Sequence, residues 1–143
     1  MTLRAHAWKF AGPLLCIATA VNAATCGSEL KGARAVESAN YTVAYRFVPA
    51  KIAVGSHFAL EAVACGRNGA AAPAALAVDA FMPDHGHGMN YKATVKRTGA
   101  TKSGGMQFRA DGLMFHMPGK WDLYFDLSGA GKSGRLTQSV MLD

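Results

Sequence analysis

The feature that most constrains the fold is an alternation of apolar and polar residues with a period of two. It is clearest at residues 121–127, WDLYFDL, where apolar side chains occupy every second position. Successive side chains of a β-strand point to opposite faces, so such a run buries one face and exposes the other. Six further runs follow the same pattern, at residues 41–47, 57–65, 76–82, 91–96, 106–109 and 136–142.

Short glycine-rich segments separate several of these runs. The segments GRNGAAAP (66–73), RTGATKSGG (97–105) and SGAGKSGR (128–135) have the composition of tight turns. No stretch with helical spacing lies between the runs. The sequence therefore predicts an all-β fold, an antiparallel immunoglobulin-like β-sandwich of about seven strands. It forms one domain, over residues 41–143.

The N-terminal residues have the pattern of an export signal. Arg4 and Lys9 precede an apolar stretch at residues 10–21 that is too short to span a bilayer comfortably. Small residues, Val21 and Ala23, then fit a signal-peptidase site. We expect residues 1–23 to be a cleaved signal peptide, with a retained anchor as the alternative.

The mature protein is then expected to be periplasmic or secreted, with no transmembrane segment after cleavage. Residues 24–40, which are small and polar, are predicted to form an extended N-terminal arm with little structure. Cys26 and Cys65 are the two cysteines that remain. Cysteines in an oxidising compartment usually pair, so we predict a disulfide that pins this arm to the end of a strand. A thiolate metal site is the alternative.

Charge and composition argue against two classes of protein. The 15 Lys and Arg residues include Arg4 and Lys9, so 13 remain against 9 acids, a net charge of +4. These cations are scattered, without the basic run or aromatic array typical of nucleic-acid binding, so we expect no nucleic-acid partner. The acids are dispersed and no G-x-S-x-G motif occurs, so we expect that the protein is not an enzyme.

One octet, MPDHGHGM at residues 82–89, concentrates metal-ligating side chains. His85 and His87 lie two residues apart, so both rings project to one side of an extended backbone. Met89 adds a thioether, and histidine with methionine suits copper. Zinc is the less favoured metal and would use both histidines with Asp84. The alternative is a structured turn in which glycines adopt positive φ and the imidazoles form hydrogen bonds.

A second segment, LMFHMPG at residues 113–119, carries His116 with Met114 on the same face. If this segment ends beside residues 82–89, His116 and a methionine can complete a site with the two histidines there. The sequence alone does not establish that proximity. The alternatives are that His116 bonds to backbone at a strand end and that the methionines fill the core.

Two longer segments, VDAFMPDHGHGMNYKATV and MQFRADGLMFHMPGKWDLYFDL, resemble the YtkA-like family of small exported bacterial domains. The family's Met-Pro-acid-His-x-His-Gly loop is matched at residues 82–88. Its second motif is matched by Gly112, Leu113, Phe115, Met117, Gly119 and Trp121. The resemblance covers residues 41–142 and implies an immunoglobulin-like sandwich. It also implies a metal- or copper-related role, or companionship with exported haem and respiratory enzymes.

These patterns predict an exported copper-binding protein that carries copper or delivers it to a redox enzyme or assembly factor. The predicted ligands are His85, His87, Met89, His116 and Met114. The alternative is a metal-free interaction module, with the His-Gly loop as a contact surface for an exported haem or respiratory enzyme.

Overall fold

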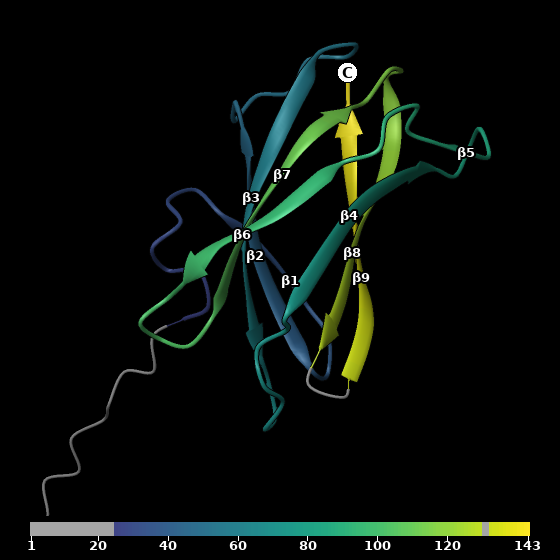
Figure 1. The fold of residues 1–143 in the computed structure, drawn as a ribbon. Helices are drawn as coiled ribbons and strands as arrows, with labels where there is room; N and C mark the ends of the chain where they lie inside the picture. Colours follow the sequence, from purple (N-terminus) through teal and green to yellow (C-terminus); the bar gives the residue numbers. More distant parts are fainter. Residues whose placement is uncertain (1–24, 130–131) are drawn as a thin grey trace, which may run out of the picture.

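A computed structural model of the chain describes residues 25–129 and 132–143. These residues form two antiparallel sheets packed face to face, with no helix among them (Figure 1). The predicted all-β sandwich is therefore confirmed. The predicted signal peptide, residues 1–23, lies outside the described residues.

The five-stranded sheet has the order β1-β2-β3-β7-β6. Its strands are β1 (Arg34–Glu37), β2 (Tyr41–Val48), β3 (His57–Gly66), β7 (Met106–Met114) and β6 (Thr94–Ala100). The four-stranded sheet has the order β5-β4-β8-β9. Its strands are β5 (His87–Gly88), β4 (Ala75–Met82), β8 (Gly119–Gly129) and β9 (Lys132–Leu142). Strands that are consecutive in the sequence thus lie in different sheets at several points. Segments that are distant in the sequence therefore become neighbours in the fold.

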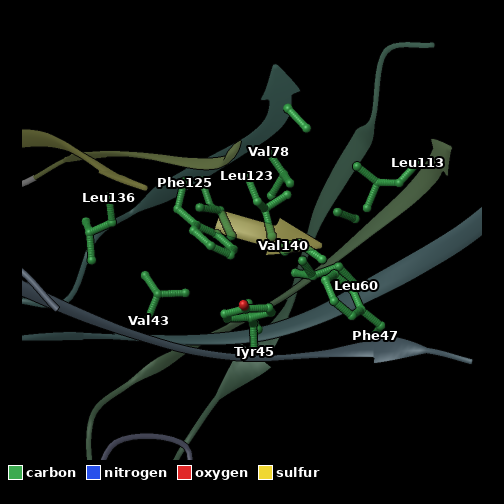
Figure 2. Packing of buried hydrophobic residues seen from close by; sticks show 14 of the residues in the cluster. Val43, Tyr45, Phe47, Leu60, Val78, Leu113, Leu123, Phe125, Leu136 and Val140 are labelled. Atoms are coloured by element: carbon green, nitrogen blue, oxygen red, sulfur yellow. The ribbon is translucent and has the colours of Figure 1, made fainter. Parts of the chain in front are cut away.

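The core lies between the sheets, and alternation decides which side chains enter it (Figure 2). In β8 the residues Trp121, Leu123, Phe125 and Leu127 are at most 1% exposed. From the other sheet, β2 and β3 contribute a matching set that includes Tyr45. Burial of this apolar surface is the main force that holds the sheets together.

Two segments differ from the sequence prediction. The arm predicted to have little structure contains β1, whose four residues pair with β2 along the edge of the sheet. Residues 91–93 were predicted to begin a strand, but β6 begins at Thr94 and continues to Ala100, into a segment predicted as a turn. A register shift between Arg97 and Gly99 accommodates this extension, because a bulge lets an irregular strand stay paired.

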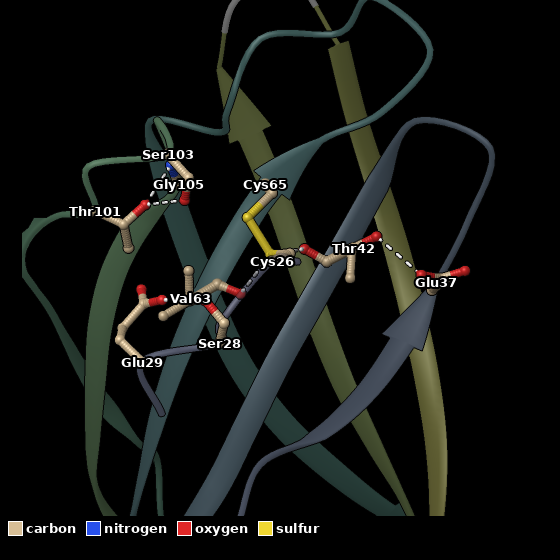
Figure 3. The surroundings of a disulfide bond; sticks show 10 residues. All are labelled: Cys26, Ser28, Glu29, Glu37, Thr42, Val63, Cys65, Thr101, Ser103 and Gly105. Carbon is tan, nitrogen blue, oxygen red and sulfur yellow. Dashed lines mark hydrogen bonds between the residues drawn. A yellow bond between two sulfur atoms is a disulfide. The ribbon is translucent and has the colours of Figure 1, made fainter. Parts of the chain in front are cut away.

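The predicted Cys26–Cys65 disulfide is present (Figure 3). Cys65 lies near the end of β3, opposite Thr42 of β2, and Cys26 lies above both strands. Gly27 then approaches β2 so closely that a Cβ at this position would lie 2.2 Å from the Cβ of Ala44. The disulfide therefore ties the arm across the outer face of the five-stranded sheet. Within residues 25–129 and 132–143, no helix is long and apolar enough to span a membrane.

Candidate metal site

Residues 82–89 form the turn of the β4–β5 hairpin, which projects from the body of the sandwich (Figure 1). The Met82 carbonyl accepts hydrogen bonds from the backbone amides of His85, at 3.2 Å, and Gly86, at 2.9 Å. Gly86 has a φ of 69°, in the left-handed region that favours glycine. The backbone is therefore the structured turn that was the alternative interpretation. The hydrogen bonds that form the turn are backbone bonds and use no imidazole.

Strand pairing sets the direction of His87. It is the register partner of Met82, a core residue that is 1% exposed. Residues directly opposite on paired strands share a face, so His87 lies on the core side of the hairpin. Its ring centroid is 5.9 Å from that of Trp121, which is fully buried in β8. His87 is half-buried as a result, whereas His85 is exposed on the turn.

His116 reaches the same place from the other sheet. It lies in the short crossing between β7 and β8, which two hydrogen bonds hold in position. The Gly55 amide donates to the Phe115 carbonyl at 2.8 Å, and the Trp121 indole donates to the Met117 carbonyl at 3.0 Å. The ring centroid of His116 is then 5.3 Å from that of Trp121.

His85, His87 and His116 therefore lie together, and we name them the histidine cluster. The ring centroids of His87 and His116 are 5.1 Å apart, and those of His85 and His87 are 5.8 Å apart. Trp121 forms one wall, with its ring steeply inclined to both His87 and His116. The proximity on which the predicted site depended is thus present.

The polar atoms of the cluster are unequally satisfied. Nδ1 of His87 lies 3.1 Å from the carbonyl oxygen of Gly88. Nδ1 of His116 is buried and has no hydrogen-bond partner within the described residues. Buried polar groups are nearly always paired, so this nitrogen lacks a partner that a rearrangement of the neighbouring side chains could supply.

The side chains are not arranged around a metal ion as they stand. Within residues 25–129 and 132–143, no three His, Cys, Asp or Glu side chains form a ligand group. Nitrogens that share one ion at about 2 Å must lie within about 4 Å of each other. The ring centroids are 5.1 and 5.8 Å apart, so the side chains would have to reorient to place three nitrogens around one ion.

The predicted thioether ligands occupy different positions. Met89 belongs to the hairpin, where its amide donates to the Ala80 carbonyl at 3.2 Å and its side chain packs against the core. Met114 is the last residue of β7, and its register partner is His57 rather than a residue of the histidine cluster. Met89 therefore shares the hairpin with His85 and His87, whereas Met114 does not. Trp121 was predicted only as a strand residue, although its inward position in the alternation was a signal for its place beside the site.

No family model matches the chain, and no curated protein matches it. The chain is similar to the crystal structure of a DUF4426 family protein from Pseudomonas aeruginosa PAO1, with a TM-score of 0.45 and 9% sequence identity. That similarity covers 77% of this chain and 98% of the other. At this level the neighbour does not bear on the role of this chain. The resemblance to the YtkA-like family stays a prediction from motifs.

Proposed function

We propose that this protein binds one copper ion in the histidine cluster and carries or delivers copper outside the cytoplasm. The observation that carries the proposal is the convergence of His85 and His87, from the β4–β5 hairpin, with His116, from the β7–β8 connection. Imidazole suits copper in both common oxidation states, and a thioether from Met89, two residues after His87, would favour copper(I).

The buried Nδ1 of His116 supports the proposal further. Coordination would satisfy this nitrogen, which has no hydrogen-bond partner within the described residues. Trp121 contributes an apolar wall that limits the access of water from one side. The residues around a metal ion control its access to solvent. With Trp121 on one side and the exposed His85 on the other, the proposed site would hold the ion but leave one side open.

The uneven exposure of the cluster fits transfer of the ion. His85 is exposed on the projecting β4–β5 hairpin (Figure 1), whereas His87 and His116 are half-buried. An incoming ligand from a partner protein, such as an exported redox enzyme or its assembly factor, could displace His85 first. The Cys26–Cys65 disulfide is compatible with an oxidising compartment, in agreement with the predicted periplasmic or secreted location.

A competition titration tests the proposal. Copper(I) is titrated into the protein against a coloured copper(I) chelator, beside the double variant His85→Ala/His87→Ala and the control His57→Ala. His57 is exposed and contacts Tyr91 instead of the cluster. We expect one tight equivalent of copper in the protein and the control, and its loss in the double variant. Equal affinity in all three would contradict the proposal.

A metal-free interaction module is the second candidate, and the projecting hairpin favours it. Loops that project from a rigid scaffold often carry binding residues. In that case the double variant keeps the weak copper affinity of any surface histidine but loses a partner protein. The copper titration therefore separates the two candidates.

A further inference from the structure

β6 is the last strand of the five-stranded sheet, so its backbone pairs with β7 on one side only. It is 7 residues long and contains no proline, and within residues 25–129 and 132–143 no other strand pairs with it. Figure 1 shows its end directed away from the four-stranded sheet. An edge of this kind presents unpaired backbone donors and acceptors to another chain. The copper proposal makes no use of this edge.

The segment that contains β6 is basic throughout. Residues 85–110 contain no acid, and their cations are Lys92, Lys96, Arg97, Lys102 and Arg109. Arg109 is neutralised, because it forms ion pairs with Glu61 and Asp111. The other four cations are exposed, and in the part of the chain that the structure describes they form no ion pair. The edge therefore carries positive charge that nothing in the described fold compensates.

The cations of β6 lie on both faces of the strand. Arg97 is the register partner of Phe108, a core residue that is 3% exposed, so Arg97 lies on the inner face at the rim of the sandwich. Lys96 precedes it and lies on the outer face, beside its register partner Arg109. Side chains of an added strand alternate in the same way, so two neighbouring acids in that strand would meet both cations. A flat anionic surface such as a membrane would contact one face only.

Charge on an edge strand also has a simpler role, since it hinders pairing between exposed edges. The other edges carry compensated charges, because Glu37 of β1 pairs with Arg67 and Arg135 of β9 pairs with Asp126. Protection from aggregation does not require that every cation of β6 be left without an acid. Like charges placed opposite each other are destabilising, so a second β6 is a poor occupant of this edge. Charge complementarity instead favours an acidic chain.

We propose that the free edge of β6 binds an acidic, extended segment of a partner protein, which adds to the sheet as a sixth strand. Backbone hydrogen bonds to β6 supply affinity, and neighbouring acids that meet Lys96 and Arg97 supply specificity. The proposal does not depend on copper binding. A segment bound here would nevertheless lie near the β4–β5 hairpin, because only residues 89–93 separate β5 from β6.

Fluorescence anisotropy with a labelled peptide of sequence TVEEVT, capped at both ends, tests the proposal. Its two glutamates are adjacent, so they fall on opposite faces of a strand. One comparison peptide is TVKKVT, and the other is TVEEVT with both glutamate amides N-methylated, which keeps the charge and removes two backbone donors. We expect saturable 1:1 binding of TVEEVT, at least 10-fold tighter than either comparison peptide. The absence of saturable TVEEVT binding would overturn the proposal. Equal binding of the N-methylated peptide would also overturn it, because charge attraction alone would then suffice.

Variants then locate the binding site. Lys96→Gln/Arg97→Gln is expected to weaken TVEEVT binding at least 10-fold. The matched control, Lys51→Gln/Lys120→Gln, also removes two exposed cations and is expected to leave binding unchanged. Thermal unfolding confirms that both variants are folded. Equal weakening in the two variants would mean that net charge is the cause, and would overturn the assignment to β6.

Amide hydrogen exchange tests the added strand itself. Saturating TVEEVT is expected to slow exchange at least 10-fold for the β6 amides that face away from β7. Unchanged exchange along β6 in the presence of bound peptide would overturn the proposal.

An anionic membrane surface is the other occupant that a basic edge could select. Sedimentation with vesicles of phosphatidylglycerol and phosphatidylcholine distinguishes the two. We expect the parent protein and Lys96→Gln/Arg97→Gln to bind these vesicles equally weakly. Vesicle binding that this variant loses, without binding of TVEEVT to the parent protein, would assign the edge to a membrane surface and overturn the proposal.

Discussion

His87 and His116 stack with ring centroids 5.1 Å apart and ring planes 29° apart, although one lies in the β4–β5 hairpin and the other in the β7–β8 connection. His87 is held by pairing between β5 and β4, and His116 follows the last residue of β7. The backbone positions of the hairpin and the β7–β8 crossing therefore limit the separation of the two rings, and rotation of the side chains changes it within that limit. The proposed copper site depends on this relationship, and most of the predictions below probe it or its supports.

Trp121 should report copper binding directly. Its indole lies 5.3 Å from His116 and 5.9 Å from His87 between ring centroids, and it is fully buried. A paramagnetic copper(II) ion held by these histidines is expected to quench Trp121 fluorescence by more than half, whereas zinc is not. The measurement is a fluorescence titration, with Trp121→Phe to define the background. Quenching that persists in His87→Ala/His116→Ala would show that the ion binds elsewhere.

The Gly86 backbone should be needed for both stability and copper affinity. Its φ of 69° costs a residue with a Cβ about 1–2 kcal/mol, although a Cβ would meet no atom within 4 Å. Gly86→Ala is therefore expected to lower the free energy of unfolding by about 1 kcal/mol and weaken copper binding. Gly86→Asn is the matched control, because asparagine tolerates this conformation better. Denaturant unfolding and copper titration of both variants check this. Equal effects of alanine and asparagine would contradict the backbone explanation.

Loss of the Cys26–Cys65 disulfide should destabilise the protein without removing copper binding. The bond joins cysteines 39 residues apart in sequence. Loop entropy then predicts a loss of about 3–4 kcal/mol in the free energy of unfolding. Urea unfolding of Cys26→Ser/Cys65→Ser against the oxidised protein measures it. A loss of copper stoichiometry in the folded double variant would mean that these sulfurs contribute to the metal site, the alternative that the sequence left open.

Acid should remove one contribution to stability on the outer face of the four-stranded sheet. Arg135 donates two hydrogen bonds to Asp126, at 2.6 and 2.7 Å, and holds the pKa of that carboxyl below its usual range. A folded pKa below the unfolded one stabilises the protein above the unfolded pKa, near 4. That contribution disappears as the pH falls through the folded pKa. Asp126→Asn should therefore be less stable than the parent protein at pH 7.

The difference in stability between the parent protein and Asp126→Asn should vanish at low pH. Both proteins are unfolded in urea between pH 7 and pH 2.5, and the parent curve should fall toward that of Asp126→Asn below about pH 4. The difference will be small, because the pair is partly exposed and solvent screens it. A difference that stays constant across this range would mean that the hydrogen-bonded ion pair is not its source.

Most strands of the sandwich could be predicted because the alternation of apolar and polar residues shows which side chains are buried. The run at residues 121–127 gave the correct inward set, including Trp121 and Phe125. β1 and β5 could not be predicted in this way, since strands of four and two residues are too short to show a period. The boundary of β6 was wrong because glycine at position 99 suggested a turn, whereas the strand accommodates it with a register shift.

The sequence suggested the residues of the candidate site but not their arrangement. His85 and His87 were expected on one face of an extended backbone, but His85 lies in the turn and is exposed, whereas His87 lies in β5 and is half-buried. The two rings are neighbours through the turn, with centroids 5.8 Å apart. The approach of His116 depends on which strands neighbour one another, and β7 belongs to a different sheet from β4 and β5. Met114 shows the same limit, because its neighbour across the β3–β7 pair is His57. Local sequence patterns contain no information on these long-range pairings.

The most direct test of the account is a copper(I) competition titration of His116→Gln beside His57→Gln. Both substitutions remove one imidazole, but only His116 belongs to the histidine cluster. The account predicts that His116→Gln weakens copper(I) binding at least 10-fold, while His57→Gln binds like the parent protein. Parent-like affinity in His116→Gln would contradict the central claim that the two chain segments form one copper site.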